Sequence, residues 1–195
     1  MDGESTFSAD QDLRSFLDEL RQYENRRIHD GSTVVERLER SLARLQELTL
    51  FVELTPPVYG QSDGWSPREI LARTVLMTQV LGWGMWATGS GEQDEVSLSS
   101  FLSVHDVSGR QFAEMAPEEL LDMARTELTN SMEYLCMADR EEMARVGRVG
   151  PFELTAAEMG ELLLCAHLEM RVEQLERSLQ LQRREPSIAP RRYAH

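Results

Sequence analysis

Apolar residues recur every three or four positions along much of the chain, which is the spacing of one face of an α-helix. The most regular stripe lies between residues 34 and 52, and a more charged amphipathic segment precedes it from Asp10 to about His29. The apolar positions of these two segments are Leu13, Phe16, Leu17, Leu20 and Tyr23, then Val34, Val35, Leu38, Leu42, Leu45, Leu48 and Val52. The pattern predicts two helices, the second of which ends at Thr55-Pro56-Pro57.

Three further helices are predicted from their start signals. Ser66-Pro67-Arg68-Glu69 combines an N-cap serine, a first-turn proline and the glutamate of a capping box, and opens a helix over residues 66–87. Pro117-Glu118-Glu119 opens the next helix, with acidic residues in its first turn. Thr155-Ala156-Ala157-Glu158 is a second capping box and predicts the longest helix, to about Gln182.

No segment alternates like a strand over any useful length, so the predicted fold class is all-α, a four-helix bundle with an extra N-terminal helix. Residues 92–116 form a long connection between the second and third bundle helices, with a short helix expected around Leu98–Val104. A connection of this length suggests a crossover or a lid. The predicted organisation is an acidic N-terminal extension with a helix (1–31, with 1–9 disordered), the bundle (32–182) and a basic disordered tail (183–195).

Composition narrows the class of protein. The chain has 195 residues, enough for one domain, and a formal net charge of −14. Such an acidic body repels phosphate backbones, so nucleic acid is not expected as a partner. No apolar run is long enough to cross a bilayer and the N-terminus has no signal-peptide pattern, so the expected compartment is the cytoplasm. Cys136 and Cys165 lack zinc-type spacing and are expected to be free, buried thiols.

Two distant segments carry a resemblance to a known family. The first is Gly64-Trp65-Ser66-Pro67-Arg68-Glu69-Ile70-Leu71-Ala72-Arg73, and the second is Ala166-His167-Leu168-Glu169-Met170-Arg171-Val172-Glu173-Gln174-Leu175. Together they resemble the signature segments of the DinB-like superfamily, named for DNA-damage-inducible proteins, which includes mycothiol-dependent maleylpyruvate-isomerase-type N-terminal domains. The resemblance implies a DinB-like four-helix bundle and covers roughly residues 33–180.

The same resemblance identifies where the family binds metal. Family members carry one histidine on the helix after the tryptophan and a His-x-x-x-His pair on the last helix; here those positions are Arg73, His167 and Arg171. The family site holds a divalent ion such as zinc or nickel, which is thought to activate a low-molecular-weight thiol. Guanidinium groups stay protonated and offer no lone pair, so the sequence predicts a degenerate site with no metal. A thiol cofactor remains open.

Two arginines near one histidine suggest several alternatives. They could form internal ion pairs with acids such as Glu69, Glu127 or Glu133, or reach solvent. They could instead hold a carboxylate or phosphate of a small molecule, with the histidine as hydrogen-bond partner or general base. The candidate ligand-binding residues are Trp65, Arg73, Met77, His167, Arg171 and Gln174, with His167 the only catalytic candidate.

Three functions follow as hypotheses. The first is a metal-free DinB-like bundle that binds a small, anionic molecule in a stress or protective role, as the resemblance implies. The second is a thiol-dependent transferase or isomerase that uses His167. The third is a non-catalytic structural protein, with Trp83 and Trp86 in a homodimer contact favoured by the small Gly82 and Gly84 beside them.

Overall fold

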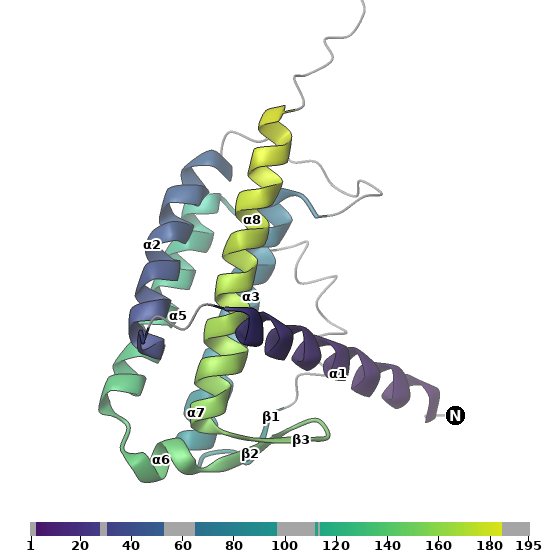
Figure 1. Cartoon of the computed structure of the whole chain (residues 1–195), viewed down its shortest axis with the longest axis vertical. Helices are drawn as coiled ribbons and strands as arrows, with labels where there is room; N and C mark the ends of the chain where they lie inside the picture. The colour runs from purple at the N-terminus through teal and green to yellow at the C-terminus, as the bar shows by residue number, and fades with distance from the viewer. Residues whose placement is uncertain (1–2, 28–30, 53–64, 97–111, 113, 185–195) are drawn as a thin grey trace, which may run out of the picture.

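The computed structural model describes residues 3–27, 31–52, 65–96, 112 and 114–184. Over these residues the chain is mostly helical, with six helices packed together and a small three-stranded sheet. The long helices α2 (Val34–Val52), α3 (Pro67–Ser90), α5 (Pro117–Met137) and α8 (His167–Arg184) run side by side (Figure 1). Helices α2 and α3 each pack against both α5 and α8, so their apolar faces meet in one core.

The predicted helix starts are confirmed at the level of individual hydrogen bonds. Ser66 caps α3: its Oγ accepts a bond from the backbone N–H of Glu69 at 3.2 Å, and Glu69 Oε2 accepts from the N–H of Ser66 at 2.8 Å. Thr155 and Glu158 form the same reciprocal pair before α7 (Ala156–Glu158). Helix α3 ends at Gly91, whose φ of 80° is the left-handed conformation common at helix C-termini. Capping therefore fixes where the chain enters and leaves α3.

The N-terminal helix α1 (Gly3–Arg26) begins within the segment 1–9, which the sequence had suggested is disordered, so that expectation is wrong for residues 3–9. Leu13, Leu17 and Leu20 are completely buried and belong to the same core as the long helices. Helix α1 runs across the other helices rather than along them, and it packs against the segment that precedes α8 (Figure 1). The α1 side chains thus cover a part of the last helix that the long helices leave open.

A three-stranded sheet, β1 (Glu95–Val96), β2 (Val146–Val149) and β3 (Phe152–Thr155), corrects the expectation that the chain has no strands. Strands β2 and β3 pair antiparallel around the two-residue loop 150–151, and β1 pairs parallel with β2. Gly150 has a φ of 59°, as the tight hairpin turns require. Each strand is too short for alternation to be visible in the sequence.

The last helix is continuous from Ala156 to Arg184, as predicted, but its middle is not regular α-helix. Residues Met159–Ala166 form a π-helical segment, η1, between α7 and α8. The stretch from Leu163 to Leu168 is buried at every position, His167 included. A helix that is buried all round lies inside the protein rather than at its surface. Helix α1 on one side and α2 and α3 on the other explain this burial.

Two predictions fall on parts of the chain outside the described residues. These are the short helix around Leu98–Val104 and residues 185–195 of the expected disordered tail. The tail was expected to begin at residue 183, but Arg183 and Arg184 are the last residues of α8, so the expectation is wrong for these two. In the described part of the chain, none of the helices is apolar over a length that would span a bilayer.

Candidate functional site

The sequence-predicted residues lie on two helices and the turn that opens one of them. Trp65 immediately precedes the N-cap of α3, and Arg73 lies two turns into that helix. His167, Arg171 and Gln174 follow one another on α8 at spacings of four and three residues, which places them on one face. Because α3 packs against α8, the two sets can meet.

Trp65 is the centre of this group. The guanidinium carbon Cζ of Arg73 lies 3.5 Å from the centroid of the indole ring, and Cζ of Arg171 lies 5.3 Å from it. Both distances are within the range of a cation–π interaction, in which the negative face of the ring attracts the cation. The indole ring of Trp65 therefore attracts both guanidinium groups, although their like charges repel each other.

Arg171 makes its hydrogen bonds to neutral acceptors. Its Nε donates to His167 Nε2 at 3.2 Å, and its Nη1 donates to Gln174 Oε1 at 2.6 Å. Within the described part of the chain, Arg171 forms no ion pair with Glu69, Glu127, Glu133 or any other acid. Glu69 instead accepts a hydrogen bond from the backbone N–H of Ser66. The alternative of internal ion pairs with these acids is therefore wrong for Arg171.

The electrostatic surroundings of Arg171 do not favour its charge. Burial lowers the pKa of the Arg171 guanidinium; the Glu19 carboxylate acts in the opposite direction, and the Arg73 guanidinium lowers it further. A cation that has lost much of its hydration and lies near another cation is stabilised by an anion, which would offset both effects. The site is thus suited to an anionic group.

His167 and Met77 are core residues. The His167 side chain is only 1% exposed, and its ring packs edge-on against Phe16 of α1, with centroids 5.7 Å apart and planes at 64°. Because His167 Nε2 accepts the Arg171 bond, the proton of the neutral ring lies on Nδ1. Met77 is 3% exposed and belongs to the hydrophobic core. Helix α1 thus covers the histidine that the resemblance places in the metal site.

The residues at the family's metal position do not fit a metal ion. His167 supplies one imidazole, whereas Arg73 and Arg171 carry protonated nitrogens without lone pairs. In the described ranges, no group of three or more His, Cys, Asp or Glu side chains could hold a metal ion. No chemistry through a metal is derived for this site.

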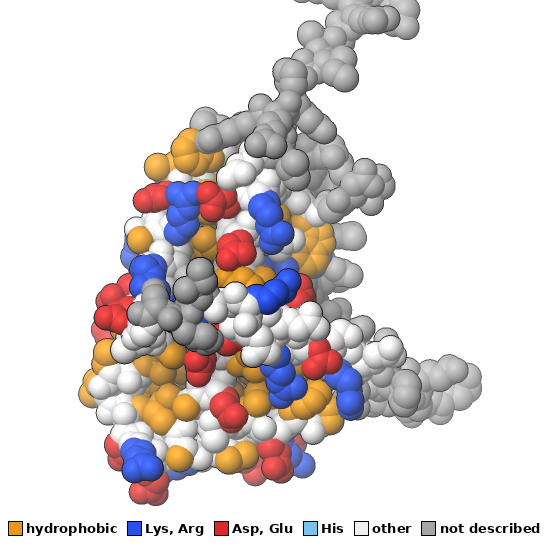
Figure 2. All heavy atoms as spheres, viewed as in Figure 1, with side chains coloured by type: hydrophobic (Ala, Val, Ile, Leu, Met, Phe, Trp, Pro, Cys, Tyr) orange, Lys and Arg blue, Asp and Glu red, His pale blue; other side chains and the backbone are white. Residues whose placement is uncertain are grey.

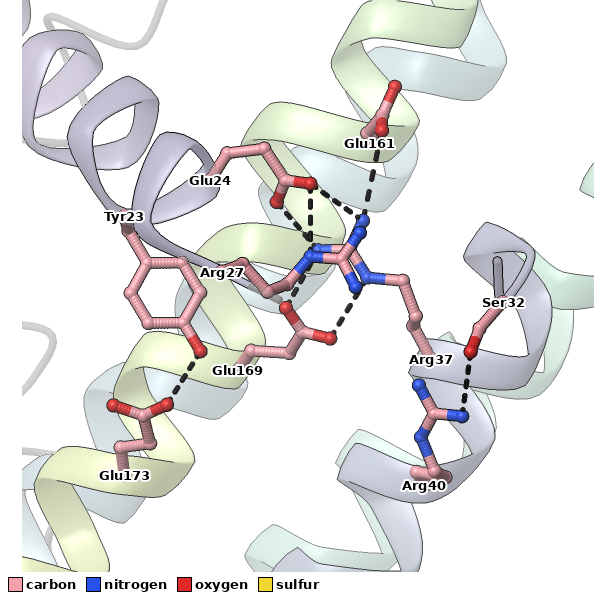
Figure 3. Close-up of polar contacts among 9 residues, drawn as sticks. All are labelled: Tyr23, Glu24, Arg27, Ser32, Arg37, Arg40, Glu161, Glu169 and Glu173. Atoms are coloured by element: carbon pink, nitrogen blue, oxygen red, sulfur yellow. Dashed lines mark hydrogen bonds and ion pairs between the residues drawn. The ribbon is translucent and has the colours of Figure 1, made fainter. Parts of the chain in front are cut away.

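A second polar cluster, which sequence reasoning missed, joins α1, α2 and α8 (Figure 3). Arg37 on α2 is 1% exposed and donates hydrogen bonds to two carboxylates, while a third, that of Glu161, forms an ion pair with its Nη1 at 3.8 Å. Its Nε and Nη2 donate to the two oxygens of Glu169 at 2.9 and 2.7 Å, and its Nη2 and Nη1 donate to those of Glu24 at 2.7 and 3.3 Å. We call Glu24, Arg37 and Glu169 the ion cluster. The ion cluster connects three helices, and α8 is far in sequence from α1 and α2.

The charges of the ion cluster stabilise one another. Burial alone would lower the pKa of Arg37, but the hydrogen bonds from its guanidinium to Glu169 and Glu24 outweigh burial and raise it. Burial alone would raise the pKa of Glu24, but Arg37 and Arg27 outweigh it and lower that pKa. Beside the cluster, Tyr23 donates to Glu173 at 2.7 Å. Acidic and basic side chains alternate over this face of the molecule (Figure 2).

The two thiols differ in exposure. Cys165 is buried, and burial, with the Glu169 carboxylate, raises its pKa to about 12, so it is inert as a nucleophile. Cys136 is exposed, which corrects the expectation that both thiols are buried.

Comparison of the chain with protein-family models, with curated proteins and with solved structures gives no match. The DinB-like resemblance therefore stays a prediction that depends on the two quoted segments.

Proposed function

We propose that the chain is a DinB-like bundle that has lost the metal triad and binds a small anionic molecule at Trp65, Arg73 and Arg171. The observation that carries the proposal is the state of Arg171, a half-buried guanidinium that lies near Arg73 and, among the described residues, donates hydrogen bonds only to neutral acceptors. A carboxylate or phosphate placed against Trp65 would accept charge-assisted hydrogen bonds from Arg171 and offset its charge. The resemblance implies a stress or protective role for such a protein.

The geometry gives less support to a thiol-dependent transferase or isomerase that uses His167. A general base needs a free lone pair within hydrogen-bond reach of the proton that it removes. The Nε2 lone pair of His167 accepts the bond from Arg171, and the ring is buried beneath Phe16. Binding rather than catalysis is therefore the function that we put forward.

Anion binding is tested by ligand-induced stabilisation. Inorganic phosphate, benzoate, oxalate and glutathione are screened by thermal unfolding, and at least one carboxylate or phosphate is expected to raise the melting temperature. A ligand at a hundred times its Kd adds about 2.7 kcal/mol to the free energy of unfolding. Arg171→Met should abolish this effect while leaving the helical circular-dichroism signal unchanged.

Arg177→Met is the matched control, because Arg177 lies on the same helix but is exposed and, among the described residues, donates only to the backbone oxygen of Glu173. It should keep the full stabilisation. If none of the four anions stabilises the protein, or if both variants lose the effect equally, the proposed site is wrong.

The loss of the metal triad has its own test, by elemental analysis of purified protein. The wild-type chain should carry no stoichiometric zinc or nickel. The double variant Arg73→His/Arg171→His would restore the three imidazoles of the family pattern, and it should take up about one zinc per chain, since three histidines and water complete a zinc site. One equivalent of zinc in the wild type, or a folded double variant that binds none, would contradict the DinB-like assignment of these positions.

A further inference from the structure

A groove of about 670 Å³ lies between α3 and α5, on different residues from the Trp65 site. Trp83, Trp86 and Ser90 line it from α3 at spacings of three and four residues, so they form one row on that helix. A second row on α5, formed by residues 127, 130, 134 and 137, lines the opposite side. Both walls are regular helices, so the groove is preformed.

Two glycines of α3 set the close approach of the helices at this groove. A Cβ on Gly82 would lie 2.6 Å from the Oγ of Ser131, and a Cβ on Gly89 would lie 1.9 Å from the hydroxyl oxygen of Tyr134. The tyrosine therefore reaches across to the backbone of α3. Gly84 serves packing inside the chain as well, since its Cβ would meet Val96 of β1 at 3.0 Å. These glycines need no second copy of the protein to explain them.

The groove exposes unusually large apolar side chains. Trp83 is 44% exposed, Trp86 is 37% exposed and Met137 is 84% exposed. Leaving two neighbouring indoles in water forgoes a large part of the free energy that their burial would supply. Exposed aromatic groups gathered around a cavity are typical of a binding site.

The charged residues that line the groove in the described part of the chain are all acidic. Glu127, Glu133 and Glu142 supply carboxylates, and among the described residues that line the groove none is Arg, Lys or His. Arg145 lies beside this part of α3, where its Nη1 donates to the backbone oxygen of Gly89 at 2.6 Å. Burial, with Glu142 and Asp139, raises the pKa of Tyr134 in spite of Arg145. The potential at the groove is therefore negative, in a chain of net charge −14.

We infer that this groove binds an organic cation with flat apolar groups, such as a quaternary ammonium or phosphonium compound. Indole faces attract a soft, weakly hydrated cation. The three carboxylates supply the opposite charge, but they are not expected to bind a hydrated metal ion strongly. A second copy of the chain fits less well. A two-fold dimer would place groove against groove and bring six carboxylates together, which like-charge repulsion disfavours.

The test compares two ions of the same shape and opposite charge, tetraphenylphosphonium and tetraphenylborate. We expect tetraphenylphosphonium to quench the tryptophan fluorescence and to bind, by calorimetry, at least about tenfold more tightly than tetraphenylborate. Trp83→Ala and Glu127→Gln should each weaken tetraphenylphosphonium binding about two- to fivefold or more. Glu118→Gln, an exposed acid on the same helix outside the groove, should leave the affinity unchanged.

Arg171→Met should also leave tetraphenylphosphonium binding unchanged, so this inference can fail or hold independently of the proposed anion site. Equal binding of the two ions would mean that the groove is only an apolar surface, and the inference would be wrong. It would also be overturned if tetraphenylphosphonium failed to bind, or if the chain formed a dimer at the assay concentration that buried Trp83 and Trp86.

Discussion

Replacing Arg37 with leucine should lower the free energy of unfolding by about 3 kcal/mol, measured by urea denaturation. The guanidinium is buried and holds both oxygens of Glu24 and of Glu169, so its removal takes away the cation that lies between these two carboxylates. Among the described residues, Glu24 then keeps only Arg27, whose Nε donates to Glu24 Oε1 at 3.1 Å. Breaking a buried ion pair by deleting one partner costs about 3–5 kcal/mol. The lower end of this range applies because the two carboxylates each keep 15% exposure.

Arg44→Leu is the matched control on the same helix. Arg44 pairs with Glu47 and with Glu176 of α8, but its side chain is 42% exposed. Water screens such pairs, which contribute about 0.2–1 kcal/mol. A loss for Arg37→Leu no larger than that for Arg44→Leu would show that the ion cluster does not hold α1, α2 and α8 together.

The difference in the free energy of unfolding between the wild type and Arg37→Leu should also depend on pH. Arg37 and Arg27 hold the pKa of Glu24 below its ordinary value despite burial. A carboxyl with a lowered pKa contributes stability that is fully present above its unfolded pKa, about 4.3 for Glu, and that is lost as the pH falls through the lower folded pKa. The difference between wild type and Arg37→Leu should therefore be constant at neutral pH and shrink below about pH 4.

Helices were predictable here because their signals are local. The capping boxes at Ser66 and Thr155 place oxygen acceptors within three residues of the donors that they satisfy, so one sequence shows them. The sheet was missed because its strands have two or four residues, too few for periodicity, and because β1 pairs with a strand about fifty residues away. The loop 150–151 with its leading glycine was the available hairpin signal.

Part of the candidate site could also be predicted from the sequence, but for a different reason. His167 and Arg171 share a face by spacing alone, whereas the position of Arg73 beside them came from the resemblance. The ion cluster had only a weak signal, an arginine beside the apolar stripe of α2. Its partner Glu169 lies 132 residues away, and a single sequence does not show which of many acids a buried arginine will meet. Burial of His167 under Phe16 depends on α1, which lies outside the residues 33–180 that the resemblance covers.

Leu17→Ala should lower the free energy of unfolding by about 2–5 kcal/mol, the usual cost of removing a fully buried leucine and leaving a cavity. Leu17 is completely buried where α1 packs against the rest of the core. Leu50→Ala is the control, because Leu50 is 64% exposed on α2, and it should change stability by no more than about 0.5 kcal/mol.

The shape of the Leu17→Ala transition decides whether α1 is an extension or a structural part of the fold. Its leucines lie in one core with the long helices, and its Glu24 belongs to the ion cluster, so α1 should unfold with them. Tryptophan fluorescence and circular dichroism should then report one midpoint, lowered together in the variant. If α1 instead separates in an earlier transition, residues 11–26 would lose amide protection early while the remaining helices stay folded. Because Phe16 packs on His167, that transition would uncover the histidine.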